Sequence, residues 1–157
     1  NNPNKDDWES TRDAIYHRYQ LERTDGYVYR EPFDGGINFA ASLVSLFYGE
    51  GNIARTIQIG SLAGWDSDNP TATWGGLLGF IIGPQGIAEA FSQSNLSDTY
   101  WIHRTRRNFP DKTQDALGED SFSKMAEREM RTVDRVVVQR MKGSITTDGQ
   151  YWVIPIH

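Results

Sequence analysis

Glycines recur at four-residue intervals, at positions 75, 79 and 83, within an otherwise mostly apolar stretch of the chain. Residues four apart lie on the same face of an α-helix, so these glycines would form one smooth stripe. A glycine inside a helix costs roughly 1 kcal/mol in helix propensity, and three on one face therefore indicate close backbone packing. We predict a central, tightly embedded helix that begins near Pro70 and ends at Gly83-Pro84.

The rest of the sequence also favours helices. Periodic apolar residues predict further helices over residues 6–21, 37–48, 53–63 and 121–141, with a short helical stretch at 86–91. Asn52 is a predicted N-cap, and the turn pair Asp148-Gly149 between β-branched and aromatic residues predicts a hairpin. We therefore expect an all-α helical bundle with a small C-terminal β-hairpin.

Composition excludes several classes of function. The 157 residues suffice for one domain with a core, and 16 Lys+Arg against 21 Asp+Glu imply no general attraction to nucleic acid or anionic lipid. The absence of cysteine excludes disulfides, zinc–thiolate sites and cysteine nucleophiles. The longest apolar run, residues 75–83, is too short for a membrane span. We expect a soluble protein, intracellular or secreted, with no nucleic-acid or membrane partner.

Two acidic residues, Asp66 and Asp68, stand just before the glycine-patterned helix. Their carboxylates can converge on one point, and the side chain of Asn69 can add a carbonyl oxygen. Oxygen ligands without sulfur or a nearby histidine favour Mg²⁺, Mn²⁺ or Ca²⁺ over Zn²⁺. The alternative interpretation is structural: Asp68 or Asn69 caps the helix, and Asp66 is solvated.

The segment Gly64-Trp65-Asp66-Ser67-Asp68-Asn69, with residues 53–60 before it and 72–79 after it, resembles the ADP-ribosylglycohydrolase family. That family has a C-terminal signature Gly-x-Asp-[Thr/Ser]-Asp-[Thr/Asn] followed by a glycine-patterned helix. The resemblance covers roughly residues 35–83. It implies an all-helical hydrolase that holds two Mg²⁺ ions between its helices and cleaves the glycosidic bond of ADP-ribosylated substrates. Asp66 and Asp68 match two metal ligands, and Asn69 stands where many members have Thr.

The resemblance also implies what this chain lacks. The other metal ligands of the family, and its acidic general acid or base, belong to an N-terminal half with a Gly-Asp motif that has no visible equivalent here. We therefore expect residues 1–157 to be a single segment, the C-terminal half of such a domain. A separate or missing N-terminal half would complete it as a second chain and supply the catalytic residues.

Three further residues are candidates for binding the substrate. Trp65 lies beside the carboxylates and fits the substrate site and the core equally well. Phe33 and Asp34 precede the predicted helix 37–48, where the family places its ligand pocket. The alternative favours Asp34 as a helix cap and Phe33 as a hydrophobic staple. Trp74 is expected in the core.

Two functions from different classes follow from these patterns. The first is a Mg²⁺-dependent ADP-ribosylglycohydrolase, and the second is a non-catalytic relative that binds a ligand or has a structural role. If both carboxylates are buried, the first is favoured, because two buried acids without a cation are costly. The departure at Asn69 keeps the second open. The basic run at residues 103–107 is predicted to be a solvated, charged segment.

Overall fold

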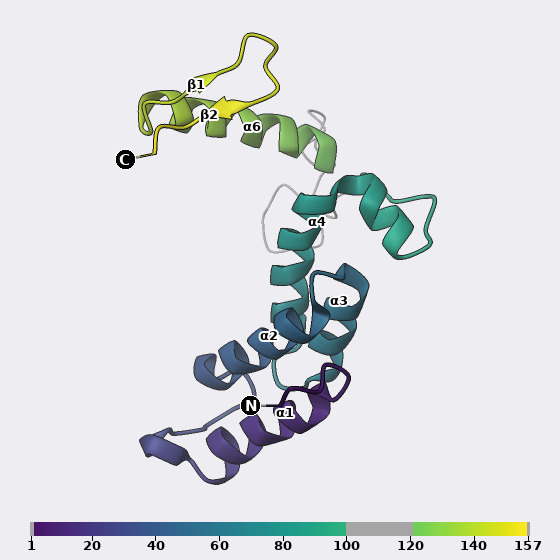
Figure 1. The fold of residues 1–157 in the computed structure, drawn as a ribbon, viewed down its shortest axis with the longest axis vertical. Helices are drawn as coiled ribbons and strands as arrows, with labels where there is room; N and C mark the ends of the chain where they lie inside the picture. Colours follow the sequence, from purple (N-terminus) through teal and green to yellow (C-terminus); the bar gives the residue numbers. More distant parts are fainter. Residues whose placement is uncertain (1, 100–120, 157) are drawn as a thin grey trace, which may run out of the picture. The chain divides into compact units, whose positions relative to one another are not determined.

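The computed structural model describes residues 2–99 and 121–156 and divides the chain into two compact units, residues 1–96 and 97–157. It is mostly helical with one small antiparallel hairpin near the C-terminus, which confirms the predicted class (Figure 1). Among the described residues, no helix has both the length and the apolar character needed to cross a membrane. The first unit contains α1 (Trp8–Ile15), η1 (Tyr16–Leu21), η2 (Thr24–Gly26), α2 (Gly35–Gly49), α3 (Ile53–Leu62) and α4 (Asp68–Ala90), and the second contains α6 (Phe122–Gln139), β1 (Ser144–Ile145) and β2 (Trp152–Val153).

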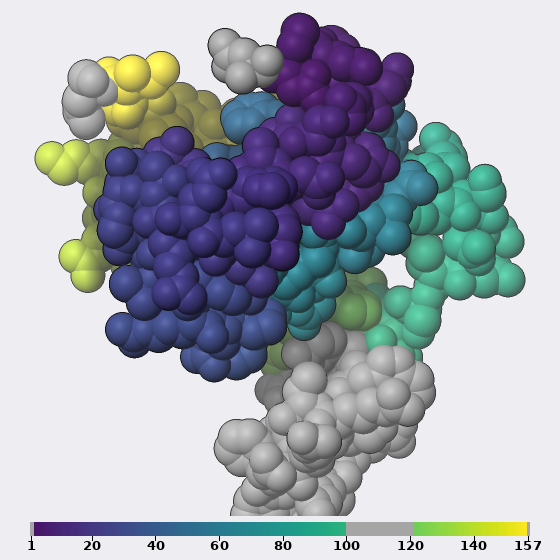
Figure 2. Space-filling view, turned by 90° about the horizontal axis from the view of Figure 1, so that it is seen from below, coloured from purple at the N-terminus to yellow at the C-terminus, as the bar shows by residue number. Residues whose placement is uncertain are grey.

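Helix α1 begins at a side-chain cap and ends in a wider helical segment. The Asp7 carboxylate accepts a hydrogen bond from the Ser10 backbone N–H, at 3.2 Å. From Tyr16 to Leu21 the chain continues as a π-helix, η1, a form that often marks functional sites. The predicted helix over residues 6–21 is therefore present, with a change of winding in its second half. Figure 2 shows these purple residues and the blue residues of the following loop and α2 as one continuous surface.

Helices α2 and α3 form the core of the first unit. Glu50 and Gly51 connect them with positive φ angles of 49° and 82°. Asn52 then caps α3 as predicted, because its side chain accepts a hydrogen bond from the Arg55 N–H at 2.9 Å. The buried apolar side chains of this unit come from three helices: Ile37, Ala41, Val44, Ile53, Ile59, Ala63 and Leu78.

Helix α4 begins at Asp68, so the predicted start at Asn69 and Pro70 is wrong by one to two residues. Ser67 is the N-cap residue and makes no side-chain capping bond. Pro70 is tolerated at the third helical position because the N–H groups of a first turn have no intrahelical partner. The predicted break is confirmed at Gly83, which has φ 71° and ψ 175° just before Pro84.

The three glycines of the α4 stripe have different neighbours: Gly75 faces α3, Gly79 lies closest to Ile87 of α4 itself, and no atom lies within 4 Å of a Cβ added to Gly83. A Cβ added to Gly75 would lie 3.5 Å from the Ile57 side chain, within ordinary contact. In contrast, Leu77, Phe80 and Ile81 are exposed. The prediction of a tightly embedded helix is therefore wrong for most of α4, and close packing against α3 is confirmed only at Gly75.

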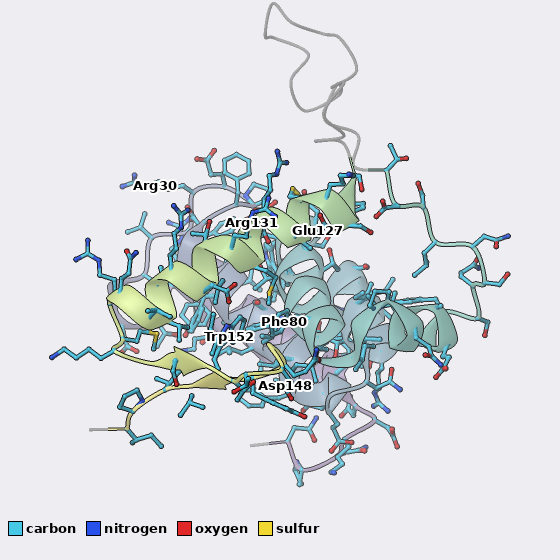
Figure 3. The ribbon with its side chains drawn as sticks, turned by 90° about the horizontal axis from the view of Figure 1, so that it is seen from above. Arg30, Phe80, Glu127, Arg131, Asp148 and Trp152 are labelled. Atoms are coloured by element: carbon cyan, nitrogen blue, oxygen red, sulfur yellow. The ribbon has the colours of Figure 1, made fainter. Side chains whose placement is uncertain are left out.

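In the second unit, α6 carries the C-terminal hairpin. Ser121 caps α6 by accepting a hydrogen bond from the Lys124 N–H at 3.2 Å, and the Asp98 carboxylate accepts one from the Ser123 N–H at 2.9 Å. Strand β1 pairs with β2 around a turn in which Gly149 has a φ of 72°. The indole N–H of Trp152, the residue labelled beside the hairpin in Figure 3, donates to Asp134 on α6 at 2.8 Å. The predicted helix and hairpin are both confirmed.

The close approach of α2 and α3 can be tested at Gly49. A Cβ there would lie 1.9 Å from Thr56 Oγ1 and 2.9 Å from Thr56 Cα, so the backbone would have to move. Overpacking of this kind costs about 1–3 kcal/mol. We expect Gly49→Ala to lower the free energy of unfolding by that amount in urea denaturation followed by circular dichroism.

Gly76→Ala is the matched control, because no atom lies within 4 Å of the added Cβ. Helix propensity should make this variant more stable by up to about 1 kcal/mol. If Gly49→Ala were as stable as the unmodified protein, the close packing of α2 on α3 would be contradicted.

Candidate functional site

The loop between α3 and α4 contains the predicted metal-binding segment. Gly64 and Trp65 are consecutive residues with positive φ, 97° and 56°. A left-handed conformation at a non-glycine residue costs of order 1–3 kcal/mol and persists only where surrounding contacts enforce it. At Trp65 one such contact is a hydrogen bond from its indole N–H to Gln20 Oε1, at 2.9 Å. The loop therefore has a defined, strained conformation immediately before Asp66.

The carboxyl group of Asp68 interacts with that of Asp66 and disfavours its ionised form. This interaction is the largest cause of a raised pKa of Asp66; partial burial and the charge of Asp68 add to it. A hydrogen bond from the Asn69 side chain acts in the opposite direction and favours the ionised form. Two interacting carboxylates repel each other at neutral pH unless a proton or a cation reduces their charge.

A pocket of about 350 Å³ lies beside this pair. Its volume is in the range of small-molecule binding sites. The early turns of α2 and α4 form much of its wall, and Asp66 contributes from the loop. The lining residues are Phe33, Gly35, Asn38, Phe39, Ser42, Asp66, Asn69, Pro70, Thr73 and Trp74. The pocket thus combines aromatic surface with one carboxylate and two amides.

The expectation that both acids are buried is wrong. Asp66 is half-buried, whereas Asp68, the first residue of α4, is exposed. The cost of burying two charges therefore does not separate the enzymatic from the non-catalytic interpretation. Asn69 lies inside the first turn of α4, and so it is not the cap that the alternative interpretation required.

The oxygen donors gathered here fit part of a hard-cation site. Within residues 2–99 and 121–156, no group of three or more His, Cys, Asp or Glu side chains is placed to hold a metal ion. Asp66, Asp68 and the amide oxygen of Asn69 would provide three oxygens. Mg²⁺ requires six ligands but commonly keeps several waters, so it accepts a partial set of protein ligands.

Phe33 and Asp34, the two residues directly before α2, were candidates either for substrate binding or for roles at the start of the helix. Asp34 occupies the N-cap position of α2, but its carboxylate accepts a hydrogen bond from the Arg30 N–H, at 2.6 Å, and none from α2. The prediction of a side-chain cap is therefore wrong. Phe33 is 63% exposed and lines the pocket, as its candidate role in binding requires.

The two tryptophans near the motif have different surroundings. Trp65 is half-buried and held by Gln20, and it does not contribute to the wall of the 350 Å³ pocket. Trp74, which we expected in the core, is half-buried, lines the pocket and donates from its indole N–H to the Ser42 carbonyl at 2.8 Å. The basic run at residues 103–107 lies outside the described residues.

Asn38 and Gln20 contact the loop but were not predicted from the sequence. Asn38 interrupts an apolar helix with an amide, a signal that could have been followed. Its Oδ1 accepts a hydrogen bond from the Asp66 N–H, at 3.0 Å, across 28 residues of sequence. Gln20 carries no comparable signal, because its partner Trp65 lies 45 residues away.

Comparison with known proteins finds no match to a protein-family model, to a curated protein or to a solved structure. The resemblance to ADP-ribosylglycohydrolases therefore depends on the residues around Asp66 and Asp68 themselves.

The carboxyl pair predicts a specific pH dependence. Because the pKa of Asp66 in the folded chain is raised, folding favours its protonated form, and this stabilisation is lost as pH rises through the raised pKa. Asp68→Asn removes one charge and should return the pKa of Asp66 toward its ordinary value. With EDTA present, we expect this variant to gain stability over the unmodified chain at about pH 7 and much less at about pH 3.

Thermal unfolding at the two pH values measures the gain, and a ¹³C NMR titration of the Asp66 carboxyl measures its pKa. Glu129→Gln is the control, since it removes an exposed charge on α6. An unchanged pKa of Asp66 in Asp68→Asn would show that the two carboxyls do not interact.

Proposed function

We propose that this chain provides part of the divalent-cation site of a Mg²⁺-dependent hydrolase that cleaves the glycosidic bond of ADP-ribosylated substrates. The observation that carries the proposal is the close Asp66–Asp68 carboxyl pair beside a pocket with aromatic walls. The resemblance of the same segment to ADP-ribosylglycohydrolases supports the choice of substrate.

Asp66 and Asp68 would hold the cation through their carboxylates, and Asn69 through its amide oxygen. Two Mg²⁺ ions, or Mn²⁺ or Ca²⁺ in their place, would supply Lewis-acid polarisation near the anomeric carbon of the ribose. The chain's own part is to bind and orient the substrate. Phe33, Phe39 and Trp74 give the pocket apolar surface, and Asp66 places an acceptor oxygen at its wall.

The proposal includes a second polypeptide. Three oxygens from this chain leave the remaining coordination positions to water and to an N-terminal half like that of the family. Glycoside hydrolysis also requires a group that protonates the leaving oxygen or nitrogen and a base that activates water. We assign these roles to the second polypeptide, and this chain would then be inactive alone.

A specific observation favours the second candidate function, a non-catalytic ligand-binding or structural protein. The Asn69 side chain hydrogen-bonds to Asp66 and stabilises its carboxylate. That contact reduces the need for a cation at Asp66. In such a protein the pocket would bind a ligand without metal-dependent cleavage.

Metal-dependent release of ADP-ribose tests the proposed function. The chain, combined with the proposed N-terminal polypeptide, is expected to release ADP-ribose from an ADP-ribosylated peptide only with Mg²⁺ present. Asp66→Ala/Asp68→Ala should abolish release and weaken Mn²⁺ binding by more than about tenfold, since ligand removal exceeds typical outer-shell effects. Chromatography of the released nucleotide and calorimetric titration with Mn²⁺ measure the two effects.

Asp13→Ala is the matched control, because it removes an exposed carboxylate on α1. Full activity in the double variant would refute the metal-binding role. Binding of ADP-ribose that is independent of Mg²⁺, with no release from the peptide, would favour the non-catalytic function.

A further inference from the structure

We infer that Asn38 and Gln20 are positioning residues that fix Asp66 for cation binding, an inference that rests on the proposed cation site. Neither side chain belongs to the Asp-x-Asp segment. Each reaches that segment from a different element: Asn38 from the first turn of α2, and Gln20 from the π-helix η1.

The Asn38 amide makes three hydrogen bonds, which engage both of its donors and its oxygen. Its Nδ2 donates to the Pro32 carbonyl at 2.6 Å and to the Asp34 carbonyl at 2.9 Å. Its Oδ1 accepts from the Asp66 N–H at 3.0 Å. The donor side fixes the orientation of the amide, so the acceptor is held in place for the backbone of Asp66.

Gln20 contacts Trp65, the residue that precedes Asp66. Its Oε1 accepts a hydrogen bond from the Trp65 indole N–H at 2.9 Å, and both side chains are half-buried. Trp65 has the strained left-handed conformation, which needs outside contacts to persist. The π-helical winding of η1 sets the direction in which Gln20 leaves the helix.

Together the two contacts hold consecutive residues, Trp65 and Asp66, from two separate elements. Asp68 is fixed independently, because it is the first residue of α4. The separation of the two carboxyls therefore depends on the loop conformation at Trp65 and Asp66. Mutation of a residue that orients a metal ligand in this way typically weakens metal affinity by about 10- to 100-fold.

The first test measures binding of Mn²⁺ alone to the full chain by electron paramagnetic resonance. Asn38→Leu and Gln20→Leu remove the hydrogen bonds with little change in size, and we expect each to weaken Mn²⁺ binding by about 10- to 100-fold. Asn38→Asp retains an acceptor for the Asp66 N–H and should bind Mn²⁺ more tightly than Asn38→Leu. Gln58→Leu, which changes an exposed amide on α3, should bind as the unmodified chain does.

A second readout does not depend on the metal. Hydrogen exchange followed by ¹⁵N NMR measures each contact directly. Exchange of the Asp66 amide should become at least about tenfold faster in Asn38→Leu, because this N–H loses its acceptor. Exchange of the Trp65 indole N–H should become at least about tenfold faster in Gln20→Leu for the same reason. Exchange of the α3 amides should stay unchanged. This comparison separates loss of the loop contacts from general unfolding.

The outcomes separate the inference from the function on which it rests. If the unmodified chain binds Mn²⁺ and Asn38→Leu binds it equally well, the positioning role is overturned. If the unmodified chain does not bind Mn²⁺ even with the proposed N-terminal polypeptide present, the proposed function fails. Faster exchange at Asp66 in Asn38→Leu would then still support Asn38 as the residue that holds the loop, and unchanged exchange would overturn it.

Discussion

The first unit depends on a close contact that glycine permits in the last turn of α3. Gly60 is buried, and an added Cβ would lie 3.2 Å from Thr71 Cγ2 on α4 and 3.5 Å from Ser45 Cβ on α2. One residue without a side chain thus lets both neighbouring helices approach the same point of α3. Interiors are packed closely enough that even one additional methyl group would displace one of them.

This packing creates the site by bringing together the early turns of α2 and α4. The Ser42 carbonyl of α2 then accepts the hydrogen bond of Trp74 from α4, and the pocket lies beside that bond. The loop after α3 is short, so it reaches the start of α4 through two residues with positive φ. One arrangement of helices therefore produces the strained loop, the aromatic wall of the pocket and the carboxyl pair.

The sequence predicted most of the features that are local. The cap at Asn52, the break at Gly83 and the hairpin around Gly149 follow from the preferences of a few neighbouring residues. The meeting of two carboxylates two residues apart is local in the same sense, and the structure shows their interaction. Their role as metal ligands stays a prediction, as does the function.

The sequence did not predict the exact start of a helix, the choice between competing hydrogen-bond partners, or contacts between distant residues. A proline fits any position of a first helical turn, so Pro70 marks the start of α4 only to within two residues. Asp34 and Asn52 are equally good caps by residue type, but a nearby backbone N–H, that of Arg30, binds Asp34 instead. The Asn38–Asp66 and Gln20–Trp65 contacts join residues 28 and 45 positions apart, and no local pattern identifies the partner in either contact.

The carboxyl pair is asymmetric, and this asymmetry determines how it can respond to a cation. Asp68 is the exposed first residue of α4. Asp66 lies in the loop, half-buried, and the neighbouring carboxyl raises its pKa. Because the pKa of Asp66 is raised, a cation that binds the pair competes with a proton at Asp66. The Asp66 N–H donates to Asn38 Oδ1 of α2 at 3.0 Å, and this hydrogen bond fixes the backbone at the residue where the exchange takes place.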